Sequence, residues 1–90
     1  MLWINTSEGR IGLSWEHAVD MRLCVCTITN EAEDILAQGA AECSRRDQYS
    51  REKGRKVSLT RALVEAEFPY DLRKEVWTGY FERKLNGKTS

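Results

Sequence analysis

The hydrophobic pattern of this 90-residue chain changes its period near the middle, and this change constrains the fold more than any other feature. Residues 21–29, MRLCVCTIT, alternate and are rich in β-branched side chains, which predicts a strand with successive side chains on opposite faces. Leu59, Ala62, Leu63 and Ala66 instead recur at the spacing of one helix face. Strands in the first half followed by helices in the second half predict an α+β fold.

Turn residues set the other expected strands. The polar TSEG separates LWIN from RIGLSW and predicts a short hairpin. Residues 35–43 can pair antiparallel with the preceding strand, although Gly39 and the alanines leave a bulge or a helix open. We therefore expect a small antiparallel sheet of three or four strands, packed by two C-terminal helices in a single domain, residues 1–90.

Both expected helices have recognisable ends. The first begins near Asp47 or Ser50, because the side chains of these residue types accept hydrogen bonds from the first N–H groups of a helix. The second follows Pro69, with Asp71 as its cap, and Asn86–Gly87 predicts its C-terminal stop.

The apolar face of the second helix is rich in aromatic residues. Its members are Leu72, Val76, Trp77, Tyr80 and Phe81. We expect this face to belong to the core and not to be a base-stacking platform, with Tyr80 as the exception because its hydroxyl favours water. Any uncovered part of the face would form a homodimer interface, so we expect a homodimer.

Composition argues against membrane and secreted proteins. Charged residues make up 31% of the chain, and no apolar stretch approaches the ~20 residues needed to span a bilayer. The N-terminal MLWINTSEGR lacks the basic start and the long apolar run of a secretory signal. We expect a soluble cytoplasmic protein with no membrane partner.

The zero net charge hides a separation of charge along the chain. Residues 1–42 hold two basic and seven acidic residues, whereas residues 45–61, here called the basic segment, hold seven basic and two acidic ones. Half of all the cations therefore lie within seventeen residues. Either the acidic half folds onto the basic segment and neutralises it, or the segment is a binding surface.

The basic segment coincides with the start of the first helix. A helix N-terminus offers free N–H groups and a positive dipole, and arginine adds a fork that suits phosphate. Arg55 falls on the extension of the packing face, where Glu52 is its expected partner. Glycine at position 54 lowers the stability of a helix by about 1 kcal/mol relative to alanine. We therefore expect a strand or a ligand to approach closely there, or else a frayed first turn.

The three cysteines do not form a disulfide framework, because their number is odd and no secretion signal precedes them. The Cys-x-Cys spacing places Cys24 and Cys26 on one face of a strand. Together with Cys43 and His17 they make a Cys₃His zinc site conceivable, but no C-x₂-C knuckle is present. Free cysteine behaves as a small apolar side chain, and we expect buried thiols and no metal.

No enzymatic motif accompanies these residues. The chain has one histidine and no nucleophile elbow, H-E-x-x-H or P-loop. A nucleophile pair of His17 with Cys24 or Cys26 stays open, although thiols buried in a strand are usually inert. We expect no enzymatic activity and no cofactor.

A longer string in the basic segment resembles one found in small bacteriophage-encoded accessory proteins. It reads D-x-Y-S-x-x-x-G-R-K-x-x-L-x-R-A-L from Asp47 to Leu63, and W-x-x-Y follows at Trp77 and Tyr80. The resemblance covers roughly residues 43–81. It implies a compact phage protein that antagonises bacterial immunity inside the host cell, by blocking CRISPR effectors or by sequestering nucleotide signals.

We therefore expect a non-enzymatic counter-defence protein whose partner is a host defence protein or a phosphate-bearing nucleotide. The expected contact residues all lie in the basic segment: Arg45, Arg46, Tyr49, Arg51, Arg55, Lys56 and Arg61. The alternative is a small nucleic-acid-binding regulator, although the pI of about 6.6 is low and the aromatic residues are not interleaved with the cations. A structural or assembly protein is a further alternative.

Overall fold

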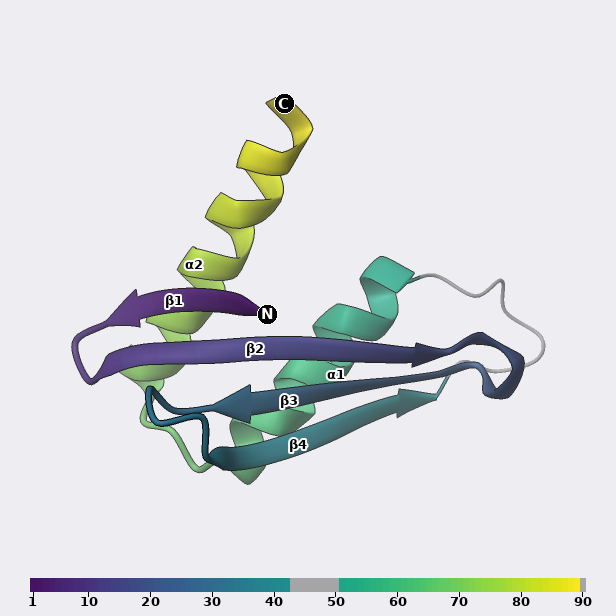
Figure 1. The fold of residues 1–90 in the computed structure, drawn as a ribbon, viewed down its shortest axis with the longest axis horizontal. Coiled ribbons are helices and arrows are strands. Elements are labelled where there is room, and N and C mark those ends of the chain that lie inside the picture. Colours follow the sequence, from purple (N-terminus) through teal and green to yellow (C-terminus); the bar gives the residue numbers. More distant parts are fainter. Residues whose placement is uncertain (43–50, 90) are drawn as a thin grey trace.

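The chain folds into a four-stranded antiparallel sheet and two helices (Figure 1). The computed structural model describes residues 1–42 and 51–89. The elements are β1 (Leu2–Thr6), β2 (Gly9–Ala18), a 3₁₀ turn (Val19–Met21), β3 (Leu23–Thr29), β4 (Ile35–Glu42), α1 (Arg51–Glu65) and α2 (Tyr70–Thr89). The strands lie in the order β1–β2–β3–β4, so each pairs with its neighbour in sequence. The expected α+β fold is confirmed, and the hairpin of the first two strands with it.

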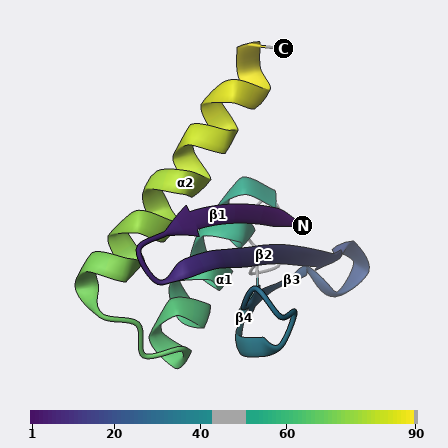
Figure 2. The ribbon, with the colours of Figure 1, turned by 60° about the vertical axis from the view of Figure 1, so that its left-hand side comes forward.

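Both helices lie on the same face of the sheet, which gives the molecule two layers (Figures 1 and 2). Alternate residues of the strands point into the space between the layers, as the period of two predicts. The buried core cluster draws on both layers: Ile4, Ile11, Leu13, Cys26, Ile28, Leu59, Ala62, Leu63, Leu72, Val76 and Tyr80. The predicted packing face of the first helix is therefore confirmed.

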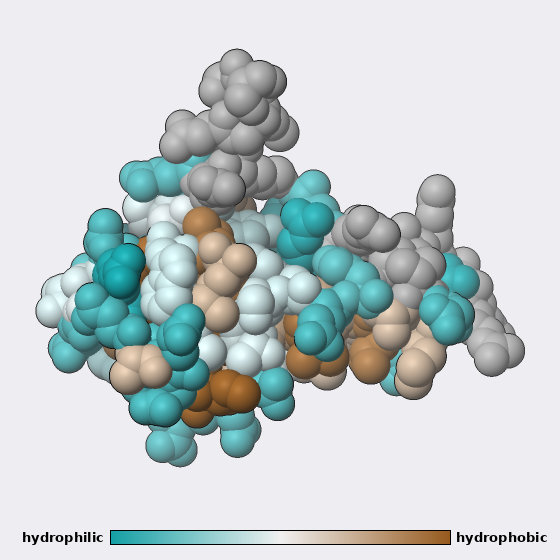
Figure 3. Space-filling model, in the orientation of Figure 1, coloured by the Kyte–Doolittle hydropathy of each residue, from teal (hydrophilic) through white to brown (hydrophobic). Residues whose placement is uncertain are grey.

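The opposite face of the sheet is not covered by the described residues. Its side chains are mixed in character and include the exposed Arg10 and Glu16 of β2. The Gln38 amide donates to the Thr27 hydroxyl between β4 and β3, and the Thr29 hydroxyl donates to the Gly12 carbonyl. Figure 3 shows this face as a largely pale surface with hydrophilic residues around its rim. An antiparallel sheet with one packed and one open face fits the alternation along its strands.

α1 lies very close to β3 and β4, and two glycines allow this approach. A Cβ atom at Gly39 of β4 would collide with backbone atoms of Ser58 and Ala62. A Cβ atom at Gly54 of α1 would lie 3.0 Å from Cys24 Cβ on β3. The close approach expected at Gly54 is thus made by a strand. Gly39 also lies in a regular part of β4, because the register shift between β3 and β4 occurs at Ile28 and Thr29.

The predicted ends of the second helix are wrong. α2 already begins at Tyr70, so Asp71 lies within its first turn, and the Arg73 N–H donates to the Pro69 carbonyl. The helix continues through Asn86 and Gly87 to Thr89, because glycine lowers helix stability but keeps helical backbone angles available. The two residues expected as N-caps of α1, Asp47 and Ser50, lie outside the described residues.

Within residues 1–42 and 51–89, neither α1 nor α2 combines the length and the apolar character that crossing a bilayer requires.

The contact at Gly39 gives a test of the packing. Gly39→Ala is expected to lower the free energy of unfolding by about 2 kcal/mol, because the added methyl group must displace the backbone of α1. Urea unfolding followed by circular dichroism measures the change. Glu42→Ala, at an exposed position of the same strand, is the control and should stay within about 0.5 kcal/mol of the wild type. Equal stability of Gly39→Ala and the wild type would contradict the close packing.

Candidate functional site

The described part of the basic segment lies in α1. Arg45, Arg46 and Tyr49 lie outside the described residues, and for Arg51 only the helical backbone is described. The structure places the remaining three predicted contact residues, Arg55, Lys56 and Arg61, on α1. They do not share one location, because their side chains engage different neighbours.

Lys56 extends from α1 towards the C-terminal half of α2. Its Nζ atom lies 3.3 Å from a carboxylate oxygen of Glu52 and 5.7 Å from the centre of the Phe81 ring. Glu52 was expected to pair with Arg55, and this prediction is wrong: its partner is Lys56. A glutamate followed by a lysine at i+4 is a favourable pair on one side of a helix. Both side chains are exposed, so the pair is weak.

Arg55 is held by its backbone while its side chain stays half-exposed. The Trp15 indole N–H of β2 donates to the Arg55 carbonyl at 3.3 Å, and the Ser58 hydroxyl donates to the same carbonyl at 3.1 Å. Within residues 1–42 and 52–82, no carboxylate lies at ion-pair distance from the Arg55 guanidinium. The β2 strand thus fixes where Arg55 sits without neutralising its charge.

Arg61 lies at the edge of the sheet, away from Arg55 and Lys56. Its guanidinium donates a hydrogen bond to the Ala40 carbonyl of β4. This bond links α1 to an edge strand, where unpaired backbone groups would otherwise invite another strand. The position of Arg61 therefore favours a structural role.

The carboxylates of the acidic first half form no ion pair with Arg55 or Lys56 in the described structure. Of the seven carboxylates in residues 1–42, Glu31 alone forms an ion pair with a described residue, and its partner is Arg10 of β2, at 3.3 Å. The Arg10 guanidinium also lies over the Trp3 ring, 5.1 Å from its centre. The charge separation seen in the sequence is thus kept in the fold.

The aromatic face of α2 is partly core and partly surface. Tyr80 is only 6% exposed and lies 5.7 Å from the Trp15 ring, so the expectation that Tyr80 would be the solvent-facing member is wrong. Phe81 takes that place: it is 43% exposed and stacks on Trp77 at 5.8 Å. The contact between Phe81 and Lys56 could not be predicted from the sequence, because it joins two residues on different helices. The homodimer stays a prediction.

The cysteines of β3 face α1 and are buried. Cys24 Sγ lies 3.6 Å from the Ser58 hydroxyl and 4.0 Å from His17 Nε2, its cross-strand neighbour. Burial raises the pKa of the Cys26 thiol to about 12, and the nearby Cys24 adds to the shift. A thiol that keeps its proton and has no access to solvent is a poor nucleophile. Cys24 itself is fully buried, so the pair of His17 and Cys24 has no exposed thiol.

The described residues contain no group of three or more candidate metal ligands, and Cys43 lies outside them. The zinc site considered for Cys24, Cys26, Cys43 and His17 therefore gains no geometric support from the two described thiols.

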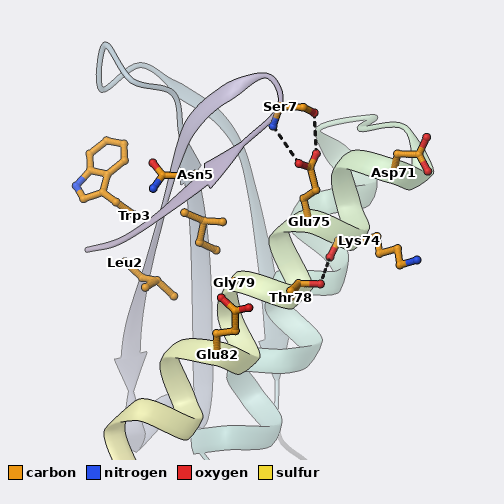
Figure 4. A pocket seen from close by; sticks show the side chains of 11 residues that line it. Leu2, Trp3, Asn5, Ser7, Asp71, Lys74, Glu75, Thr78, Gly79 and Glu82 are labelled. Carbon is orange, nitrogen blue, oxygen red and sulfur yellow. Dashed lines mark hydrogen bonds between the residues drawn. The ribbon is translucent and has the colours of Figure 1, made fainter.

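A groove lies between β1 and α2, and the sequence did not indicate it. Its volume is about 810 Å³, and it is lined by residues of β1 and by one side of α2 (Figure 4). A much smaller depression of about 360 Å³ lies beside the α1 cations, between Glu52, Lys53, Lys56 and Val57. The two hollows lie on different elements and carry different charges.

Comparison with known proteins gives no further information on the site. The chain matches no family model, no curated protein and no solved structure.

The buried Cys26 thiol predicts a pH effect on stability. The folded protein keeps this thiol protonated up to about pH 12, whereas the unfolded chain releases the proton at its ordinary value of 9.0. Its contribution to stability is therefore complete below pH 9.0 and is lost as the pH rises towards about 12. Between about pH 7 and about pH 10, the loss should reach about 1 kcal/mol.

Urea unfolding at both pH values, on the wild type and on Cys26→Ala, measures this contribution. The variant lacks the thiol, so its stability should fall less over the same interval. Identical pH dependence in the two proteins would show that the Cys26 thiol is not held in its neutral form by burial.

Proposed function

We propose that the protein is a non-enzymatic binding protein that contacts an acidic partner through the basic segment, residues 45–61. One observation carries the proposal: in the described structure, no carboxylate of residues 1–42 lies at ion-pair distance from Arg55 or Lys56. Arg55 has no ion pair in the described structure, and Lys56 has only an exposed one within its own helix. An anionic surface can therefore approach both side chains at little desolvation cost.

The shape of the surface favours a macromolecular partner over a small ligand. Small-molecule sites enclose most of their ligand and are lined mainly by apolar groups. The depression of about 360 Å³ beside the α1 cations is lined by three charged residues and Val57, so it lacks the mainly apolar lining of such sites. An acidic protein surface fits such a site better than an enclosed nucleotide does.

The resemblance of residues 43–81 to phage accessory proteins suggests the biological setting. In the proposed function, the acidic partner is a protein of the bacterial defence machinery, such as a CRISPR effector. Capture is stoichiometric and needs no chemical step, in keeping with the buried state of Cys24 and Cys26.

A second candidate, a single-stranded nucleic acid, is favoured by one observation. The Lys56 ammonium lies over the half-exposed Phe81 ring, so a cation and a stacking surface adjoin in the fold although they are separated in sequence. Proteins that bind single strands combine these two features.

Charge reversal on α1 tests the proposed function. Arg55→Glu/Lys56→Glu is expected to reduce recovery of the acidic partner by about tenfold or more, because like charges then face each other across the interface. The measurement is affinity purification of tagged protein from bacterial cells, with the bound proteins quantified by mass spectrometry. Lys74→Glu, which reverses an exposed cation on α2, is the control and should retain the partner. Unchanged recovery with the α1 double variant would contradict the proposal.

Filter binding separates the two candidates. A single-stranded DNA and an RNA of the same length are tested with the wild type at about 50 and about 200 mM salt. The nucleic-acid candidate predicts retention that falls by about tenfold over this range if about three phosphates are contacted. The acidic-protein proposal predicts no retention of either strand.

A further inference from the structure

The two edges of the sheet are exposed to different degrees. At β4, α1 packs against Gly39, and the Arg61 guanidinium donates a hydrogen bond to the Ala40 carbonyl. At β1, no further strand lies on the outer side among the residues that the structure describes. An open edge strand presents unpaired N–H and C=O groups, which can hydrogen-bond to another extended segment.

The register of the β1–β2 hairpin identifies the groups that face outward. The hairpin closes with a two-residue turn at Ser7–Glu8, and Thr6 pairs with Gly9. The pair that closes such a turn is hydrogen-bonded, and hydrogen-bonded pairs alternate along an antiparallel ladder. Trp3 and Asn5 belong to the other pairs, so their backbone N–H and C=O groups point to the open edge.

The groove described above lies along this edge. Trp3 and Asn5 line it from β1, and one stripe of α2 lines it from the other side: Asp71, Lys74, Glu75, Thr78, Gly79 and Glu82. Figures 1 and 2 show that α2 passes β1 at a steep angle, so the groove lies where the strand and the helix cross. The five residues of β1 extend over about 17 Å, which lets an extended segment of about five residues lie along this wall. The side chains of the α2 stripe line the other wall.

The α2 stripe gives the groove a negative charge. It holds three carboxylates and one ammonium group, which leaves two negative charges in excess. Glu75 is engaged at one end, where it accepts hydrogen bonds from the Ser7 N–H at 3.0 Å and from the Ser7 hydroxyl at 2.8 Å. Asp71 and Glu82 are exposed and form no ion pair with any described residue.

We propose that this groove binds an extended basic segment of a partner protein, which adds to the sheet as a fifth strand beside β1. Main-chain hydrogen bonds to Trp3 and Asn5 hold the segment, and lysine or arginine side chains at alternate positions reach Asp71 and Glu82. This site is separate from the contact proposed for the basic segment, because no lining residue belongs to α1.

Charge argues against a second copy of this chain as the occupant. Two β1 edges paired around a two-fold axis would bring two acidic α2 stripes to the same interface. Like charges facing each other oppose such a dimer and favour a basic segment.

The test uses a fluorophore-labelled heptapeptide in which lysine and valine alternate, with fluorescence anisotropy as the readout. Three peptides are compared: the lysine–valine peptide, the same peptide N-methylated at alternate backbone nitrogens, and a glutamate–valine peptide. The first should bind, the second should bind at least about tenfold more weakly because it cannot form the edge hydrogen bonds, and the third should not bind.

Protein variants locate the peptide. Asp71→Lys/Glu82→Lys should weaken binding of the lysine–valine peptide by about tenfold. Asp71→Asn/Glu82→Gln should weaken binding of the same peptide to a smaller extent. This neutral pair replaces the charge reversal if the latter impairs folding. Glu65→Lys, a single charge reversal at an exposed position of α1, is the control and should bind within about twofold of the wild type.

Four results would overturn the proposal. The first is no binding of the lysine–valine peptide by the wild type at about 1 mM. The second is equal affinity for the N-methylated peptide, which would mean adsorption by charge alone. The third is unchanged affinity in both variant pairs. The fourth is a wild-type dimer in sedimentation velocity that the peptide dissociates, since this would assign the edge to a second copy.

Discussion

Where α1 crosses β3 and β4, its backbone comes so close to the sheet that a side chain at Gly39 would collide with it. Ser58 is fully buried at this crossing, and its hydroxyl donates to the Gly54 carbonyl at 2.7 Å, which keeps a polar group satisfied inside the core. This contact fixes the rotation of α1 about its axis. The rotation determines that Lys56 faces α2 and that Arg61 faces the edge of β4.

The remaining surfaces follow from this arrangement. Because both helices lie on one face of the sheet, the charged side chains of α1 and α2 surround that layer, while the opposite sheet face, pale at its centre in Figure 3, carries Arg10 and Glu16 of β2. The cations of α1 and the carboxylates of α2 belong to separate surfaces. A chain with zero net charge thus presents one basic and one acidic region, and each can attract a partner of opposite charge.

Patterns within one element predicted most of the fold. Alternation identified β3, and helical spacing identified the packing face of α1, because burial of one face imposes its period on the residues. Features that depend on two elements were not predictable in this way. Tyr80 is buried because Trp15 of β2 covers its ring, and the groove exists because α2 runs beside β1. Arg55 lost its expected partner because Glu52 had two cations within reach and pairs with Lys56.

Nuclear Overhauser spectroscopy in solution tests the crossing of α1 and the sheet most directly, since every charged surface described above depends on it. The account predicts cross-peaks from the Gly54 α-protons to the Cys24 β-protons, and from the Gly39 α-protons to the Ala62 amide proton. Absence of both, with cross-peaks from other α1 residues to Cys24 in their place, would mean a different rotation of the helix and would contradict the account.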